Sequence, residues 1–372
     1  MISFDNVTKV YADGTIAVDQ LSLDVAAGTL TVFVGPSGCG KTTALRMINR
    51  MIEPTSGTVT VDGADVSTVD AVKLRLGIGY VIQGAGLMPH QRVIDNVATV
   101  PVLKGASRRA ARKAGYAVLE RVGLDPKLAN RYPAQLSGGE QQRVGVARAL
   151  AADPPVLLMD EPFSAVDPIV RGELQREILR LQGELHKTIV FVTHDIDEAV
   201  RLADLVAVFG PGGSLRQYDA PAQLLSRPAN DFVSSFIGAG RGYRWLQFFD
   251  STGLPLHDVQ RIFASDVSDL GDAQLRDGWA VVVNQDGTPL GWIDADGVRR
   301  YRGGAALSDS VAAVGSLLRP DGNLSQALDA ALSSPSAVGI AVDGEGTVIG
   351  GIVAPDVLAA LESQRQGRKC TT

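Results

Sequence analysis

The chain has 372 residues, of which 45% are hydrophobic and 20% are charged, and its formal net charge is −6. This length suffices for two or three domains with a large core. The acidic balance excludes a basic field over the whole protein of the kind that attracts nucleic acid, so we expect no nucleic-acid partner. Cys39 lies in a glycine-rich loop and Cys370 in the tail, which favours a reducing compartment over a structural disulfide.

The start of the chain, MISFDNVTKV, alternates like a strand and lacks the basic region and apolar core of a signal peptide. The longest apolar runs, such as LTVFVG and VLLM, are far shorter than the roughly 20 residues that cross a bilayer. We therefore expect any membrane role to come from partner proteins. Through residues 1–238, short apolar strands alternate with loops and helical stretches, which predicts an α/β domain with a largely parallel sheet covered by helices.

The first motif with a chemical meaning is GPSGCGKTT. It fits the pattern G-x-x-x-x-G-K-[ST], follows the predicted strand LTVFV and precedes the helical run ALRMINRM, which is the context that a phosphate loop requires. Glycines let backbone N–H groups curl round a phosphate, and the helix N-terminus adds the positive end of its dipole. We therefore predict that ATP and Mg²⁺ bind here, through Gly35, Pro36, Ser37, Gly38, Cys39, Gly40, Lys41, Thr42 and Thr43.

Individual side chains of this loop have separate expected roles. Lys41 is predicted to reach the β- and γ-phosphates, the Thr42 hydroxyl to bind Mg²⁺, and Thr43 to help hold the phosphates. Cys39 is either a small filler or a thiolate favoured by the helix N-terminus and Lys41. Tyr11, earlier in the chain, is either a half-buried strand residue or a ring that stacks on adenine.

A second glycine pair, in LSGGEQQRV, stands at the head of another predicted helix. Ser137 resembles an N-cap with Glu140 three residues on, a capping box that opens the helix EQQRVGVARAL. The backbone at Gly138 and Gly139 is open to a ligand, so this is a second anion-binding helix end, without a lysine of its own. Because the chain already has one complete phosphate loop, we infer that the second closes over the nucleotide of another copy. This requires a head-to-tail homodimer with ATP in its interface.

Polar residues end three of the predicted strands. Asp160 and Glu161 end VLLMDE, at the sheet edge where ligands bind. Asp160 suits the Mg²⁺ shell and Glu161 suits the general base that deprotonates the attacking water, the alternative being a solvated acidic pair. His194, ending TIVFVTH, is either a polar surface or core residue or a hydrogen-bond partner of the γ-phosphate and the water. Gln83, ending IGYVIQ, is a candidate for reaching Mg²⁺ or the water.

The remainder of the chain contains an internal repeat and most of the negative charge. AVVVNQDGTPLGWIDADGV resembles GIAVDGEGTVIGGIVAPDV, and each copy reads as a strand, a glycine turn, a second strand and the start of a helix. From Arg241 onward, 16 acidic residues stand against 11 basic ones. We predict a second, small α+β domain over residues 239–372, with repeats at about 245–305 and 306–364.

Taken together, these motifs resemble the ATP-binding cassette (ABC) ATPases over essentially all of residues 1–238. The phosphate loop, Gln83, LSGGE, VLLMDE, SAVD and His194 stand in the order and spacing of that family, and LSGGEQQR is the most specific element. The resemblance implies a P-loop NTPase fold of ABC type. It also implies that Ser137 and Gly139 contact the γ-phosphate bound by the opposite subunit, and that Asp167 belongs to the loop linking the two sites.

A narrower resemblance is to the ATPases of glycine betaine, carnitine, choline and proline importers. It rests on MINRMIEPTSG, on GYVIQGAGLMPHQRVIDNVATVPVLKG and on the paired tail repeat, which is similar to tandem CBS (cystathionine β-synthase) modules. The segment 245–255 departs from the usual start of the first module, and Gly84 stands where the family often has Gln. The resemblance implies membrane permease subunits, a separate solute-binding protein and a place at the cytoplasmic face of the membrane. Because the solute would be bound elsewhere, this chain need not contain an aromatic cage.

Two other function classes remain open at this stage: a soluble ATPase acting on DNA or ribosomes, and the ATPase of an importer for another solute. Three interpretations of the tail also remain. It binds a regulatory adenine nucleotide or cyclic dinucleotide, it senses salt through its charged surface with Arg365, Arg368 and Lys369, or it is a packed dimerisation module.

Overall fold

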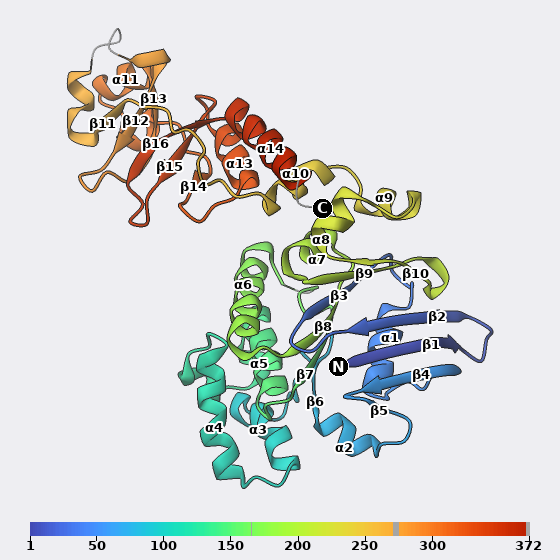
Figure 1. Ribbon diagram of the computed structural model, residues 1–372. Coiled ribbons are helices and arrows are strands. Elements are labelled where there is room, and N and C mark those ends of the chain that lie inside the picture. Colours follow the sequence, from blue (N-terminus) through green and yellow to red (C-terminus); the bar gives the residue numbers. More distant parts are fainter. Residues whose placement is uncertain (165, 271–274, 370–372) are drawn as a thin grey trace. The chain divides into compact units, whose positions relative to one another are not determined.

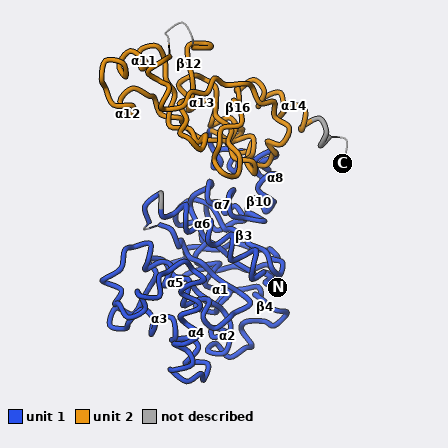
Figure 2. Tube along the Cα trace, turned by 90° about the vertical axis from the view of Figure 1, so that its left-hand side faces the viewer, with its two compact units in different colours: residues 1–239 blue, residues 240–372 orange. Residues whose placement is uncertain are grey.

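The structure is a computed structural model that describes residues 1–164, 166–270 and 275–369. The chain forms two compact units, Met1–Ala239 and Gly240–Thr372 (Figure 2). The predicted boundary lies after residue 238. None of the helices within the described ranges combines the length and apolar composition needed to cross a membrane.

The first unit is built round a six-stranded sheet with the strand order β10-β9-β3-β8-β7-β6 (Figure 1). All neighbouring strands are parallel except β10, which pairs antiparallel with β9. Every residue of the three central strands is buried, as expected for a parallel sheet covered on both faces. The strands of this sheet are β3 (Leu30–Val34), β6 (Ile78–Val81), β7 (Val156–Asp160), β8 (Thr188–Val192), β9 (Leu205–Phe209) and β10 (Leu215–Asp219).

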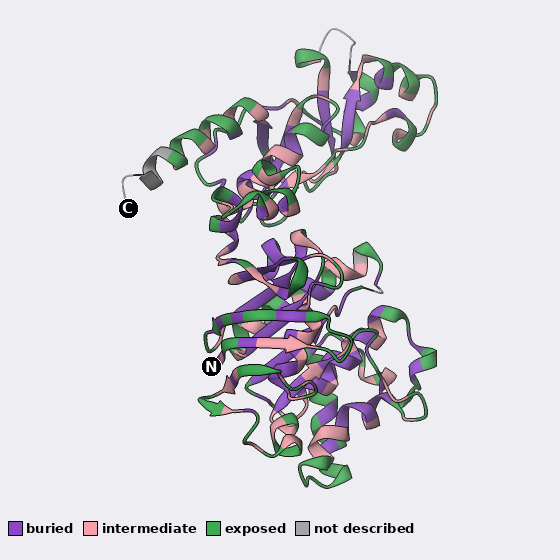
Figure 3. Cartoon of the chain, turned by 90° about the vertical axis from the view of Figure 1, so that its right-hand side faces the viewer, coloured by how far each residue is buried: buried purple, intermediate pink, exposed green. Residues whose placement is uncertain are grey.

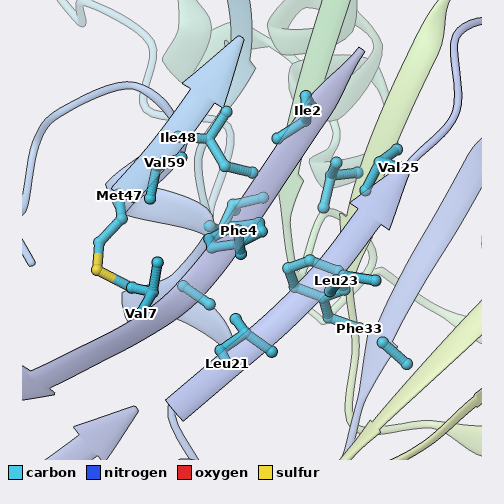
Figure 4. Close-up of a cluster of buried hydrophobic side chains, with 14 of the residues drawn as sticks. Ile2, Phe4, Val7, Leu21, Leu23, Val25, Phe33, Met47, Ile48 and Val59 are labelled. Atoms are coloured by element: carbon cyan, nitrogen blue, oxygen red, sulfur yellow. The ribbon is translucent and has the colours of Figure 1, made fainter. Parts of the chain in front are cut away.

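A second, antiparallel sheet of the first unit has the order β2-β1-β4-β5. Its strands are β1 (Ile2–Val10), β2 (Ile16–Val25), β4 (Ser56–Val61) and β5 (Ala64–Asp65). Alternate residues of β1 and β2 point into a cluster with Phe33 of β3 and Met47 of α1 (Figure 4). The helix α1 contacts strands of both sheets, so the cluster fixes the helix that carries the phosphate loop.

Helices pack round the six-stranded sheet, and exposed residues lie on helices, on loops and on the antiparallel strands (Figure 3). The α-helices of the first unit are α1 (Lys41–Ile48), α2 (Ala71–Leu76), α3 (Val93–Leu103), α4 (Arg108–Arg121), α5 (Gly138–Leu150), α6 (Pro168–Leu185), α7 (Ile196–Leu202), α8 (Pro221–Ser226) and α9 (Asp231–Ile237). The 3₁₀ helices are η1 (Pro126–Asn130), η2 (Pro133–Gln135) and η3 (Pro211–Gly213).

The second unit consists of two copies of one motif. In the first copy, β12 (Trp279–Val283) pairs antiparallel with β13 (Pro289–Asp294), and α11 (Ala295–Arg302) follows. In the second, β15 (Val338–Val342) pairs with β16 (Val348–Val353), and α14 (Ala354–Lys369) follows. The two hairpins have the same register, including the shift near the turn, at a constant spacing of 59 residues, as from Trp279 to Val338. The repeat read in the sequence is therefore a repeat of backbone structure.

Each hairpin gains a third, parallel strand, but the copies differ after it. These strands are β11 (Arg261–Phe263) and β14 (Leu317–Leu318). A full helix, α13 (Leu324–Ser333), follows β14, whereas the 3₁₀ helix η5 (Ala264–Asp269) follows β11. The remaining helices of the unit are α10 (Arg241–Trp245), η4 (Leu246–Phe248), η7 (Arg276–Gly278) and α12 (Leu307–Ser310).

The segment that matched the expected module poorly has a different packing role. Leu246, Phe249 and Leu254 are buried in a cluster with residues of α13, β15, β16 and α14. This segment therefore precedes the first copy in sequence but packs against the second. The apolar residues at 245–255 therefore serve a packing contact with the second copy.

Candidate nucleotide and magnesium site

The glycine-rich loop joins the buried strand β3 to helix α1, as the motif requires. Gly40 is the N-cap of α1 and has a left-handed backbone with φ of 90°. A Cβ at Gly40 would lie 1.8 Å from the Ala17 carbonyl oxygen, and one at Gly35 would lie 2.3 Å from the Phe209 carbonyl oxygen. Only glycine fits these two positions, because the loop is pressed against its neighbouring backbone.

Lys41 is tied to the loop that it is expected to serve. Its side chain is buried, and Nζ donates hydrogen bonds of 2.8 Å to the carbonyl oxygens of both Gly35 and Pro36. Cys39 Sγ lies 3.6 Å from the same ammonium. Burial nevertheless raises the pKa of the Cys39 thiol, against the lowering effect of Lys41. Of the two interpretations of Cys39, this direction favours the small filler over the thiolate.

The two candidate magnesium ligands of the loop and of β7 meet directly. The Thr42 hydroxyl donates a 2.8 Å hydrogen bond to Asp160 Oδ1. Asp160 is the last residue of β7, and it is 2% exposed. A hydroxyl and a carboxylate fit Mg²⁺, which takes few protein ligands and completes its octahedron with water and substrate phosphates. In keeping with this, no group of three or more acidic, histidine or cysteine side chains forms a metal cage among the residues described.

Sequence reasoning missed the residues that hold the other oxygen of Asp160. The Tyr80 hydroxyl donates to Oδ2 at 3.3 Å, and Arg46 Nη2 donates to the same atom at 3.4 Å. Arg46 Nε also donates to the Tyr80 oxygen, a bond that raises the pKa of Arg46, while burial raises the pKa of Tyr80. With Oδ2 held in this way, Oδ1 stays turned toward Thr42. The sequence offered one indication that Arg46 could reach Asp160: it follows Thr42 by four residues and so lies on the same face of α1.

We expect Tyr80→Phe to weaken the Mg²⁺ dependence of hydrolysis selectively. The variant loses one hydrogen bond to a charged group, an effect of about 1.5–3 kcal/mol, so half-saturation should need roughly 10- to 150-fold more Mg²⁺. ATP binding without Mg²⁺ should be unchanged. Tyr218→Phe is the matched control, because the Tyr218 hydroxyl donates to the Asp24 carbonyl oxygen instead. An unaltered Mg²⁺ titration in Tyr80→Phe would contradict this role.

Glu161 lies between the other two predicted catalytic residues. His194 Nδ1 is 3.4 Å from Glu161 Oε1, and Gln83 Nε2 donates to Glu161 Oε2 at 3.4 Å. Glu161 has a left-handed backbone with φ of 44°, which is uncommon for a residue other than glycine, and its N–H donates to the Val192 carbonyl oxygen. The strand β8 ends at Val192, so His194 is two residues beyond the strand rather than its last residue.

Tyr11 lies just beyond β1 and beside the end of the phosphate loop. Its ring is 41% exposed, and its hydroxyl is 3.4 Å from Thr43 Oγ1. Lys9 Nζ lies 5.6 Å from the ring centroid. The half-buried strand interpretation is therefore wrong, because Tyr11 is exposed and lies beyond the end of β1.

The LSGGE segment forms the predicted capping box at the start of α5. The Ser137 N–H and hydroxyl both donate to Glu140 Oε2, at 2.7 and 2.9 Å, and the Glu140 N–H donates back to Ser137 Oγ at 3.3 Å. Ser137 and Gly138 are exposed, whereas Gly139 is buried, and a Cβ there would lie 2.4 Å from Val170 Cγ1. Asp167 Oδ1 accepts from the Val170 N–H at 3.1 Å. The LSGGE segment and the Asp167 turn are thus linked through Val170.

Comparison with known proteins identifies the family of this chain. Residues 18–164 match the family model of the ABC transporter ATP-binding domain. The osmoprotectant import ATP-binding protein OsmV of Salmonella typhimurium is 43% identical over 313 residues, which cover 82% of this chain and 81% of that protein. The chain belongs to the ABC transporter ATP-binding proteins.

The P-loop ABC ATPase fold predicted for the first unit is confirmed by solved structures. A dimer of the cassette MJ0796, in a post-hydrolysis state with ADP and phosphate, has a TM-score of 0.55 and 33% identity and covers 59% of this chain and 99% of that one.

Other relatives of this ABC protein are named for quaternary amines. The glycine betaine/carnitine/choline transport ATP-binding protein OpuCA of Bacillus subtilis is 49% identical over 241 residues, which are 65% of this chain. The glycine betaine uptake ATP-binding protein YehX of Escherichia coli is 48% identical over 238 residues, which are 64% of this chain and 77% of that protein. The match spans 63% of the length of OpuCA.

Proposed function

We propose that this chain is the ATP-hydrolysing, energy-coupling subunit of an ABC importer for osmoprotectants, namely the quaternary amines glycine betaine, carnitine and choline, or proline. The observation that carries the proposal is the position of Glu161. Its carboxylate lies between Gln83 and His194, and the residue before it, Asp160, is bonded to Thr42. The names of the relatives support the solute class. An importer for another small solute is the alternative, and a soluble ATPase acting on DNA or ribosomes is a more distant one.

In this proposal the residues of the first unit divide the reaction among them. The loop amides and Lys41 bind the phosphates, and Tyr11 stacks on the adenine. Thr42, Asp160 and Gln83 would hold Mg²⁺, which would supply positive charge to the phosphates. Glu161 orients the attacking water and takes its proton, and His194 hydrogen-bonds the γ-phosphate. The contact between His194 and Glu161 keeps these two side chains at one edge of the sheet.

We also propose that two copies close over ATP, each supplying the LSGGE segment for the other. The exposed Ser137 and Gly138 at a helix N-terminus support this, as does the relative MJ0796, which was solved as a dimer. The Ser137 hydroxyl donates to Glu140 in the single chain, so it must turn toward the phosphate when the dimer closes. Asp167, linked to the same segment through Val170, is placed to couple the two sites.

A groove on α3 and α4 supports the proposed docking of a membrane permease. Asn96 is fully buried, and its side chain binds the backbone of Met88, Gln91 and Arg92, which fixes the loop after Gln83. Beside this loop lies a pocket of about 350 Å³ with Arg92, Arg108 and Arg112 in its lining. A short cytoplasmic helix of the permease would fit there and hold the chain at the cytoplasmic face of the membrane. A separate protein would bind the solute outside.

The second unit is proposed to be a tandem CBS-like regulatory module. The identical register of its two hairpins supports an internal duplication. A bound nucleotide, a response to salt and plain dimerisation are the three roles considered. The basic residues near the end of α14 concern the response to salt. The Arg365 guanidinium lies 5.1 Å from the Trp245 ring centroid, and the side chains of Arg368 and Lys369 lie outside the described part.

Reconstitution with the permease and solute receptor in vesicles tests the proposal. ATPase activity and uptake should rise with glycine betaine, carnitine, choline or proline and should not rise with other amino acids or with sugars. Truncation after Gly238 should preserve this transport and abolish its dependence on salt or on added nucleotide, because a regulator must interact differently with two states. If none of these solutes is taken up or stimulates ATP hydrolysis, the proposed substrate class is wrong. A truncated transporter that keeps both responses would make the second unit purely structural.

A further inference from the structure

The second unit contains a pocket of about 310 Å³ that is lined by both copies of the repeat. Trp279 and Trp292 come from the first copy, and Val338 and Val353 come from the second. Val259, in the segment before β11, completes the apolar wall. A volume of this size is at the lower end of pockets for small ligands. It therefore suits a compact ligand with an apolar body.

The two tryptophans give this pocket an aromatic corner. Their ring centroids are 6.5 Å apart and the ring planes meet at 87°. Trp292 is 3% exposed and is locked in the core of the unit, whereas Trp279 is only partly buried. One ring is thus a fixed wall and the other an accessible one. Trp279 thus offers the accessible aromatic face, and such faces attract quaternary ammonium groups.

The charges round the rim favour a cation over an anion. Arg276 Nη1 lies 2.5 Å from Asp258 Oδ2, so that guanidinium is already neutralised. His257 Nε2 lies 2.6 Å from Asp356 Oδ2. Asp277, which also lines the pocket, has neither a hydrogen bond nor an ion pair within the described ranges. Two lining carboxylates, those of Asp258 and Asp277, therefore stand against the Arg276 guanidinium, and the phosphates of a nucleotide would meet net negative charge.

We propose that this pocket binds a small quaternary ammonium compound, with its methylated cation against Trp279 and its charge balanced by Asp277. The rings attract the cation through their quadrupoles, and the rim carboxylates add to the attraction. This chain then carries an aromatic site of its own, contrary to the expectation that it needs none. This role rests on the proposed transport function. Binding of the imported solute at this site would make the ATPase activity depend on the solute concentration inside the cell.

Binding of choline to the full-length chain, measured by equilibrium dialysis in the absence of permease, tests this site. We expect saturable binding with a dissociation constant of about 1 mM. The neutral isostere 3,3-dimethylbutanol should bind at least about tenfold more weakly, because it keeps the shape and loses the charge. Sodium chloride at matched concentration separates binding from a response to ionic strength.

Substitutions in and outside the pocket locate the binding. Trp279→Leu should weaken choline binding about tenfold or more, and Asp277→Asn about two- to threefold, because an exposed charge is screened. Trp245→Leu is the matched control: Trp245 packs against Phe249 in the same unit, outside the pocket, and its loss should leave the affinity unchanged. Choline binding that is equal in Trp279→Leu and wild type would overturn the proposal.

Two further outcomes are informative. If AMP or a cyclic dinucleotide binds and Trp279→Leu abolishes that binding while choline does not bind, the occupant is a nucleotide and the proposal is wrong. Failure of choline to bind in a chain that still supports choline uptake in vesicles refutes this site alone. Choline binding in a chain that supports no uptake of any quaternary amine refutes the transport function and leaves the site standing.

Discussion

Glu161→Gln is expected to lower the ATP hydrolysis rate by on the order of 10²–10⁴, which corresponds to about 3–5 kcal/mol of barrier. The amide keeps the shape of the side chain and most of its contacts, but it cannot accept the proton of the attacking water. ATP and Mg²⁺ should still bind, because neither Lys41 nor the Thr42–Asp160 pair depends on Glu161. The dimer should then stay closed with ATP trapped inside it.

The position of Glu161 makes this variant a sharp test. Its backbone is left-handed and its carboxylate meets both His194 and Gln83, so a substitution that changed the turn would disturb all three residues. Glutamine avoids this, because it differs from glutamate only in its terminal atom. Glu184→Gln on α6 is the control, since an exposed ion pair with Arg180 contributes little. Near-normal turnover by Glu161→Gln, measured as phosphate release, would exclude Glu161 as the base.

The parts of the fold that were predictable from the sequence are those that local patterns determine. The runs LTVFV, VLLMD and TIVFV form β3, β7 and β8, because strands buried on both faces are continuous apolar runs. The capping box at Ser137 and Glu140 needs only residues three positions apart. The repeated hairpins were visible because the same register demands the same spacing of glycines and apolar residues.

Contacts between distant residues were not predictable in this way. The Tyr80 and Arg46 bonds to Asp160 join positions 80 and 114 residues apart, and no local pattern marks Tyr80, whereas Arg46 is marked only by its four-residue spacing from Thr42. The burial that raises the pKa of Cys39 depends on packing round the loop, which sequence proximity to Lys41 does not reveal. The Trp279 and Trp292 pocket depends on how two hairpins pack, although each tryptophan was plainly in the sequence.

Mixing a Ser137→Arg chain with a Lys41→Ala chain is expected to restore activity that neither has alone. If each site combines the phosphate loop of one chain with the LSGGE segment of the other, the mixed dimer has one site that carries both substitutions. Its other site carries neither. Random pairing makes half of the dimers mixed, and each keeps one of two sites, so the mixture should regain up to roughly a quarter of wild-type hydrolysis. Ser137→Arg should retain ATP binding by the single chain, because its own phosphate loop is unaltered. With Glu161→Gln added to both chains, the mixed dimers should also persist long enough to be measured by sedimentation.

Ser107→Arg separates a shared site from a general loss of helix capping. Ser107 caps α4 as Ser137 caps α5, and in both helices the third residue donates to the serine hydroxyl at 3.3 Å. Each arginine substitution should therefore destabilise its helix by about 1 kcal/mol. Only Ser137→Arg also places a bulky side chain where the phosphate of the opposite copy must fit. ATP-dependent dimers that form with Ser107→Arg and fail with Ser137→Arg, yet reappear when Lys41→Ala is added as partner, require a site built from two chains. If the mixture stays monomeric under conditions in which the wild type dimerises, each chain holds its nucleotide alone, and the LSGGE segment serves another purpose.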